Sequence, residues 1–342
     1  MKNLCRNCFA DEELIGFIST QQKIGYCSCC DSKDVEIIEI VELFDFFKEI
    51  INNFKPDSKG NSLISLIQGN WNLFSKLEYG NKILNYILGE IDLTFSKSDD
   101  LVNFNEDIIE NINHWSKLKE QLKWERRYLT DIDYLTEDLG WDSFFGSKFR
   151  IKKNDKFFRA RLHSTADEGI FSNNEMYSPH PQIATAGRAN PLGIPYLYLS
   201  DNIDTILYEI RVSYLDEVSI ATFKLKEDIQ TDILISDFTE IPSLYVPGSV
   251  NNRIKSTLLK KLISRDLSKP MRRYDSDLDY VPTQFICEFI KVFTNVQGIK
   301  FSSSLHNVGN NIVIFDQSIM DCLEVKKVKI SKVIIKSMEL EI

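Results

Sequence analysis

Residues 157–200 read FFRARLHSTADEGIFSNNEMYSPHPQIATAGRANPLGIPYLYLS and mark where the chain changes character. The apolar and aromatic runs at the two ends, 157–162 and 194–199, are typical of strands. Between them, residues 163–195 have neither helical nor strand periodicity and contain four of the nine prolines of the chain. Because proline removes conformational freedom, we expect a stiffened loop here. Long loops of this kind commonly position a ligand.

The order of elements after Trp141 indicates an α+β domain. Strands are predicted at 157–162, 194–199, 218–225, 231–235, 298–301, 311–315 and 325–335, and helices at 202–214, 249–267 and 283–295. Helices do not separate the strands regularly, which favours an α+β fold over a doubly wound sheet. The glycine-rich loops G-x-G-x-x-G and G-x-x-x-x-G-K-[ST] do not occur, so the usual nucleotide-binding loops are absent.

The first 140 residues have a different sequence pattern, which is typical of helices. Ile40, Phe44, Phe47 and Ile51 recur at three- and four-residue steps, as expected for one buried helix face. Further helices are predicted around 63–76, 82–91 and 107–124, with polar loops such as 55–61 between them. We therefore expect three segments: a cysteine-rich knuckle at 1–35, a bundle of four or five helices at 36–140, and the α+β domain at 141–342.

Five of the seven cysteines lie in the first 30 residues. Cys5 and Cys8 form one C-x-x-C pair, Cys27 and Cys30 form a second, and 18 residues lie between the two pairs. This spacing is typical of a four-thiolate zinc site. Cys29 is an alternative fourth ligand, although the two-residue gap favours Cys30. Two disulfides or a redox C-x-x-C are competing interpretations, which a reducing cytosol and the lack of a surrounding βαβ pattern disfavour.

Composition limits the classes of function. The chain has 342 residues, of which 43% are hydrophobic, and a formal charge of −9. An acidic protein is a poor general binder of nucleic acids, because phosphate neutralisation needs a basic surface. The N-terminal residues lack the apolar region of a secretory signal, and no apolar run reaches the ~18 residues that span a bilayer. We expect a cytoplasmic protein without membrane contact.

The second half of the sequence contains a series of short motifs. They are Phe158-Arg159-Ala160-Arg161, Met176-Tyr177-Ser178-Pro179, Gly187-Arg188-Ala189-Asn190-Pro191, GIPYLYLS at 193–200, DTILYE at 204–209, Pro282-Thr283-Gln284 and GIKFSSS at 298–304. In this order the motifs resemble the RES domain family, which is named for an arginine, a glutamate and a serine, and the likeness covers residues 157–315. The cysteine pairs followed by helices resemble the accessory region of one subgroup.

This resemblance implies a fold similar to ADP-ribosyltransferase toxins and an activity on NAD⁺. It implies a toxin that depletes NAD⁺ by hydrolysis or phosphorolysis and is paired with an antitoxin protein. Carried over residue by residue, the catalytic residues are Arg188, Glu209 and Ser303. Residues that would hold the dinucleotide are Arg159, Asn190 and Tyr198.

The chemistry of NAD⁺ cleavage explains these residue types. Breaking the nicotinamide–ribose bond develops positive charge on the ribose and releases a neutral base, so a carboxylate beside the ribose stabilises the transition state. We expect Glu209 to do this on a helix that Ser200 or Asp201 caps. Arginine side chains pair well with phosphate oxygens, which suits Arg188 and Arg159. Ser303 would orient the nicotinamide side.

Each of these residues also has a more ordinary interpretation. Taken alone, Glu209 is typical of a solvated helix surface, Arg188 of a turn and Ser303 of a strand end whose hydroxyl bonds the backbone. Other functions therefore stay open: a protein ADP-ribosyltransferase, a protein that binds NAD⁺ without cleaving it, and an RNA-binding module built on the cysteine-rich half.

Overall fold

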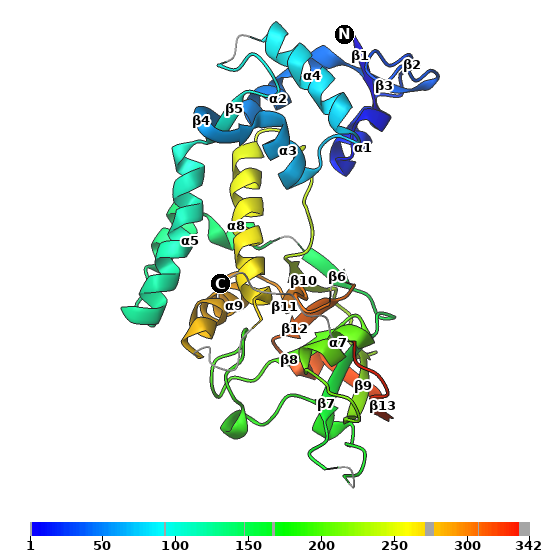
Figure 1. Ribbon diagram of the computed structural model, residues 1–342, viewed down its shortest axis with the longest axis vertical. Helices are drawn as coiled ribbons and strands as arrows, with labels where there is room; N and C mark the ends of the chain where they lie inside the picture. The colour runs from blue at the N-terminus through cyan, green and yellow to red at the C-terminus, as the bar shows by residue number, and fades with distance from the viewer. Residues whose placement is uncertain are drawn as a thin grey trace. The chain divides into compact units, whose positions relative to one another are not determined.

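The computed structural model describes residues 2–91, 94–146, 148–165, 168–270, 277–306 and 308–334. The chain forms two compact units, each built from two stretches of sequence (Figure 1). Residues 1–118 and 240–261 form the N-terminal unit, and residues 119–239 and 262–342 form the sheet unit. The expected boundaries near residues 35 and 140 stay predictions. Among the described helices, none has both the length and the apolarity needed to cross a membrane.

A small antiparallel sheet carries the first cysteines of the N-terminal unit. Its central strand β3 (Val35–Glu39) pairs with β1 (Asn3–Cys5) on one side and β2 (Ile24–Gly25) on the other. Helix α1 (Glu12–Thr20) connects the two outer strands. The pairing brings the end of β1, which carries Cys5, toward the turn after β2, where the second cysteine pair lies.

Helices form most of the remaining N-terminal unit, as the sequence predicts. They are α2 (Phe44–Ile51), α3 (Leu63–Trp71), α4 (Leu77–Glu90) and the first part of α5 (Glu106–Trp124). The expected polar loop at 55–61 is wrong, because these residues belong to strand β4 (Phe54–Ser62), which pairs with β5 (Leu101–Phe104). The rings of Phe54 and Phe104 lie 5.1 Å apart. Such cross-strand packing outweighs the low strand propensity of the polar residues.

The segment 240–261 packs within the N-terminal unit although it is distant in sequence. Leu244, Val250 and Ile254 are buried in the same apolar core as α2 and α3. The ring of Tyr245 contacts Phe46, with ring centroids 4.8 Å apart. This core also includes the start of α8 (Val250–Ser268), a helix that the sequence predicts correctly.

The sheet unit contains eight strands in the order β13-β9-β7-β8-β12-β11-β10-β6 (Figure 1). The strands are β6 (Lys148–Ile151), β7 (Phe157–Leu162), β8 (Leu197–Ser200), β9 (Glu217–Leu225), β10 (Ile233–Asp237), β11 (Gly298–Ser302), β12 (Asn310–Ile314) and β13 (Met320–Lys329). Among the strand pairs that the described residues form in this sheet, β10–β11 is parallel and the others are antiparallel. The expectation of an α+β fold with a helical N-terminal part is confirmed.

Several expected elements have different bounds, among them one strand and one helix of the sheet unit. The strand predicted at 325–335 is β13, which begins earlier, at Met320, and ends earlier, at Lys329; residue 335 lies outside the described residues. The helix predicted at 202–214 is α7 (Ile203–Glu209), and Arg211 just beyond it has a positive φ of 56°. A left-handed residue cannot continue a right-handed helix, so the helix stops close to Glu209.

Helix α7 lies on β7, β8 and β12 (Figure 1). Its last residue, Glu209, contacts Asn311 of β12. Its N-cap is Asn202, whose side chain accepts a hydrogen bond of 3.0 Å from the backbone N of Thr205. The expected caps are therefore wrong. Ser200 and Asp201 instead bind Asn310 at the start of β12.

Residues 163–195 contain no helix or strand apart from the short 3₁₀ turns Asn174–Met176 and Pro181–Ile183 in their described part. This confirms the expected loop. The loop is fixed to the sheet by the Tyr177 hydroxyl, which donates a 3.0 Å hydrogen bond to the carbonyl of Met320. It then reaches the turn that carries Arg188.

Candidate functional site

Four cysteine sulfurs gather in the N-terminal unit. The Sγ atoms of Cys5, Cys8, Cys27 and Cys30 all lie within 4.8 Å of one another. The Sγ of Cys5 is 3.8 Å from that of Cys8 and 3.4 Å from that of Cys30. A tetrahedron with Zn–S bonds of ~2.3 Å has sulfur–sulfur edges of about 3.8 Å. The cluster could hold a metal ion, and its dimensions are compatible with zinc.

The neighbouring Cys29 lies outside this group of four, although its thiol also contacts that of Cys8. Its Sγ lies 3.9 Å from the carbonyl oxygen of Tyr79, in the apolar core. Cys29 and Cys30 were the two candidates for the fourth metal ligand, and the structure groups Cys30 with the other three sulfurs. Because protein thiolates would fill all four coordination positions of the metal, such a site has no open position for a substrate.

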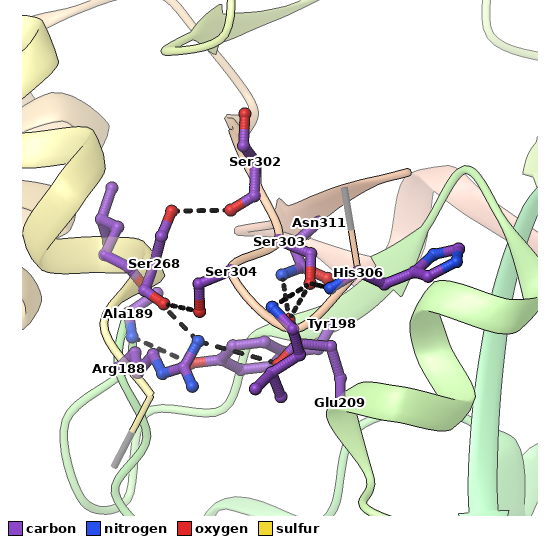
Figure 2. A network of polar contacts seen from close by, with 12 residues as sticks. Arg188, Ala189, Tyr198, Glu209, Ser268, Ser302, Ser303, Ser304, His306 and Asn311 are labelled. Carbon is purple, nitrogen blue, oxygen red and sulfur yellow. Dashed lines mark hydrogen bonds and ion pairs between the residues drawn. The ribbon is translucent and has the colours of Figure 1, made fainter. Parts of the chain in front are cut away.

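A second polar cluster brings together Arg188, Glu209 and Ser303 in the sheet unit (Figure 2). Oε1 of Glu209 accepts a 2.8 Å hydrogen bond from Oγ of Ser303. Oε2 of Glu209 lies 3.7 Å from Nη1 of Arg188, and both side chains are only 15% exposed. A partly desolvated ion pair interacts more strongly than an exposed one. The three residues therefore form one electrostatic unit. They are far apart in sequence, because Arg188 lies in the loop before β8, Glu209 at the end of α7 and Ser303 just after β11.

Asn311 completes the cluster and was not among the predicted residues. Its Nδ2 donates a 2.8 Å hydrogen bond to Oε1 of Glu209. The residue lies on the central strand β12 and is 6% exposed. The sequence offered no signal for it, because one asparagine in a run of two has no spacing that points to Glu209.

The turn that carries Arg188 is fixed by its neighbours. The Tyr198 hydroxyl donates to Oδ1 of Asn190 at 2.8 Å and accepts from the backbone N of Ala189 at 2.9 Å. Burial raises the pKa of Tyr198 above its ordinary value, so the hydroxyl keeps its proton. A Cβ on Gly187 would lie 2.6 Å from Oδ1 of Asn190, so only glycine fits this close approach. The predicted binding residues Asn190 and Tyr198 thus shape the turn in this structure.

Helices α8 and α9 (Val281–Phe293) hold the same turn from another side. The hydroxyl of Thr283 donates to the carbonyl of Arg188 at 2.6 Å, and Nε2 of Gln284 donates to the carbonyl of Gly187 at 2.8 Å. At the end of α8, the carbonyl of Leu267 accepts a 3.4 Å hydrogen bond from Nη1 of Arg188. These contacts leave the guanidinium between the helix end and Glu209.

Arg159 lies in β7 and bonds strand β8, which follows this turn. Its Nη1 donates to the carbonyl of Tyr198 at 3.3 Å, and its buried Nε has no hydrogen-bond partner. The pKa of Arg159 is lowered to about 10, mainly because burial removes water from the guanidinium and also because the positive charge of Arg161 is near. Within the described residues no carboxylate pairs with it. A buried cation without a counter-ion is costly, and an anionic ligand would supply the missing charge.

A cavity of about 110 Å³ opens beside Arg188. Its wall includes Lys119 and Lys123 from the last part of α5, which lie in the sheet unit, and Lys269 after α8. Lys119 and Lys123 are each paired with an aspartate, at 2.8 Å and 2.5 Å. The sequence gives no signal for this wall, because α5 lies far from Arg188 along the chain.

Fold and site together define a mixed α/β domain with an arginine–glutamate–serine cluster at the end of a short helix. A family model described as the RES domain matches residues 156–335. The chain therefore belongs to the RES domain family, which confirms the resemblance read from the sequence. Searches of curated proteins and of solved structures find no match.

Proposed function

We propose that this protein cleaves the bond between nicotinamide and ribose in NAD⁺. The observation that carries the proposal is the convergence of Arg188, Glu209 and Ser303, three residues separated in sequence, in one partly buried cluster. Membership of the RES family, which is associated with NAD-related toxins, supports the same substrate. The product would be free nicotinamide together with an ADP-ribosyl compound.

In the proposed reaction the bond between C1′ of the ribose and N1 of nicotinamide breaks, and its electron pair leaves with the nicotinamide. The ribose then carries positive charge, which the carboxylate of Glu209 stabilises. If water adds to C1′, the products are ADP-ribose and a proton. If phosphate adds instead, the product is ADP-ribose phosphate. Because neutral nicotinamide is a good leaving group, no strong general acid is needed.

Two arginines are suited to the diphosphate of the substrate. Arg159 is a desolvated guanidinium without a counter-ion among the described residues, and Arg188 stands at the cluster beside Glu209. Guanidinium groups bind phosphate oxygens through paired N–H donors. We therefore assign both arginines to holding the dinucleotide in the orientation that brings its ribose to Glu209.

The N-terminal cluster would hold one structural zinc ion through Cys5, Cys8, Cys27 and Cys30. Zinc bound by four thiolates fastens chain segments together and supplies no reaction chemistry. Thiolates persist in a reducing compartment, and NAD⁺ is an intracellular dinucleotide. Both points agree with action in the cytoplasm.

NAD⁺ depletion would make the protein toxic, and a neutralising antitoxin protein is the partner that this function calls for. Large apolar side chains near the Arg188 loop are available for such a contact: Tyr128 is 94% exposed and Leu192 is 75% exposed. Both residues line one wide pocket of the sheet unit.

Incubation of the purified protein with NAD⁺, with and without phosphate, tests the proposal. Chromatography should show free nicotinamide. ADP-ribose in both samples would identify hydrolysis, and a second product only with phosphate would identify phosphorolysis. Intact NAD⁺ with a folded protein would overturn the proposal, and labelled protein from labelled NAD⁺ would replace it with a protein ADP-ribosyltransferase.

A further inference from the structure

We propose that Asn311 is a positioning residue, which acts together with Ser303 to fix Glu209 so that its Oε2 faces the substrate. This inference rests on the proposed function for the identity of the substrate. Its geometric part, the fixed orientation of the carboxylate, rests on contacts within the sheet unit (Figure 2).

The two oxygens of Glu209 have different surroundings. Oε1 accepts two hydrogen bonds of 2.8 Å, one from Oγ of Ser303 and one from Nδ2 of Asn311. Oε2 has no hydrogen bond from the described residues and faces Nη1 of Arg188 at 3.7 Å. Two donors use the in-plane acceptor positions of one carboxylate oxygen. Oε2 is therefore the oxygen left for the ribose.

Ser303 has no spare proton for a ligand in this arrangement. Its hydroxyl proton goes to Glu209, while its oxygen accepts hydrogen bonds of 3.2 Å from the backbone N of Leu305 and of His306. A hydroxyl has only one proton to donate. Ser303 thus positions the carboxylate, whereas the role expected from the family resemblance was to orient nicotinamide.

Asn311 is itself held rigidly. It lies on β12, opposite Ser200 of β8 and Phe301 of β11, so both edges of its strand are paired. Strand backbones of a sheet interior hold side chains more precisely than loops do. A buried amide with a fixed backbone is suited to aim one N–H at one carboxylate oxygen.

Asn310 and His306, which lie near the two donors, are also held by Asp201 before α7 and by Thr205 within it. Asp201 accepts hydrogen bonds from the backbone N of Asn310 at 2.7 Å and from its Nδ2 at 2.8 Å. Oγ1 of Thr205 is 2.8 Å from Nδ1 of His306. Thr205 and Glu209 are four residues apart in α7, which places them on one side of the helix, and Asp201 lies just before its N-cap. The donors to Glu209 are therefore held in place before substrate binds.

Neutral donors are the right groups for this task. They orient the carboxylate through hydrogen bonds yet leave its negative charge for the ribosyl cation. A second cation at Oε1 would neutralise that charge. Preorganised groups of this kind cost no rearrangement at the moment of reaction.

Steady-state kinetics on NAD⁺ with two nearly isosteric variants tests the proposal. Asn311→Leu removes the donor, and we expect kcat to fall on the order of tenfold to a hundredfold while KM changes little. Asn311→Asp should lose more at neutral pH, because two carboxylates then face each other, and should regain part of the loss as the pH falls and a shared proton restores a donor. A raised KM with unchanged kcat would show direct substrate contact and overturn the proposal.

Ser303→Ala separates the two roles of the serine. A positioning role lowers kcat and leaves inhibition by added nicotinamide unchanged. Weaker inhibition by nicotinamide would show that Ser303 binds the base, which contradicts the proposal. Val308→Ala, at a residue 76% exposed in the same loop, is the control and should leave the kinetics unchanged.

A double-mutant cycle between Glu209→Gln and Asn311→Leu, read by urea denaturation, does not depend on turnover. Residues in contact give non-additive changes in unfolding free energy. If the wild type leaves NAD⁺ intact, the proposed function fails, and the cycle still decides whether Asn311 fixes Glu209. Coupling supports the positioning role, and additivity overturns it.

Discussion

The cysteine cluster and the glutamate cluster bring their side chains together in opposite ways. The four cysteines lie between residues 5 and 30, and two short C-x-x-C turns on one small sheet assemble them. Arg188, Glu209 and Ser303 come from a loop, a helix end and a strand end that only the eight-stranded sheet brings together. The first cluster depends on local spacing, and the second depends on the whole sheet.

Loss of a thiolate is the largest effect that we expect. Structural zinc contributes roughly 10 kcal/mol or more to the folding of small domains. Cys8→Ser removes one of the four thiols of the proposed zinc site. We therefore expect this variant to bind no zinc, where the wild type should bind one ion, and to lose a large part of the stability of the N-terminal unit. Metal analysis of the purified protein and thermal unfolding measure both changes.

Cys29→Ser is the matched control for that experiment. Cys29 is the neighbour of the proposed ligand Cys30 in the sequence, but its sulfur faces the carbonyl of Tyr79. This variant should keep about one zinc per chain. Loss of zinc from Cys29→Ser with retention in Cys30→Ser would reverse the assignment of the fourth ligand.

Removal of the carboxylate charge is the next largest effect. Glu209→Gln keeps the shape of the side chain but removes the charge that, in the proposed reaction, stabilises the ribosyl cation. Loss of one such electrostatic group typically lowers kcat by about 10²- to 10³-fold. Nicotinamide release from NAD⁺ gives the rate, and the thermal midpoint should stay close to that of the wild type.

Asp204→Asn provides the comparison on the same helix. Asp204 is exposed and lines a different pocket from the glutamate cluster. The Asp204→Asn variant loses one negative charge, as Glu209→Gln does, and we expect its activity to be nearly unchanged. Equal losses in both variants would mean that net charge, not the placement of Glu209, controls the rate.

The contrast between the clusters explains what the sequence could predict. Spacing alone predicts the cysteine set, because ligands in short turns are close in space wherever the rest of the chain goes. The strand at 157–162 is equally local and has the predicted bounds. Asn311 was missed because its contact with Glu209 depends on the order of β8, β12 and β11, which no local pattern encodes. Strand β4 was missed because pairing with β5, not propensity, makes it a strand.

In the N-terminal unit, Asp11 links the start of helix α1 to the distant segment 240–261, so this unit also depends partly on long-range contacts. The buried carboxylate of Asp11 accepts hydrogen bonds from the backbone N of Leu14 at 3.0 Å, of Leu244 at 2.5 Å and of Tyr245 at 3.1 Å. Asp11→Ala removes a helix cap and leaves two further N–H groups without a partner. We expect the free energy of unfolding to fall by about 2–3 kcal/mol.

Urea denaturation measures this change, with Glu13→Ala as the control. Glu13 is exposed in the same first turn of α1 and should change stability by less than about 0.5 kcal/mol. If both variants lose equally little, the segment 240–261 would be held by its apolar contacts alone.

The smallest effect tests whether Tyr198 shapes the turn or holds the dinucleotide. Tyr198→Phe keeps the ring but removes the hydroxyl that binds Ala189 and Asn190. We expect a loss of about 1–2 kcal/mol in unfolding free energy. A role in stacking alone predicts unchanged stability, since the ring remains, and the variant thus separates the two roles.

The pH dependence of that loss adds a second readout. Burial raises the pKa of Tyr198, so the folded protein keeps the hydroxyl protonated where the unfolded chain ionises. The stability difference between the wild type and Tyr198→Phe is fully present below about pH 10 and shrinks above it, because ionisation then stabilises only the unfolded wild type. A difference that stays constant through this range would show that the hydroxyl is exposed to water and does not hold the turn of Arg188.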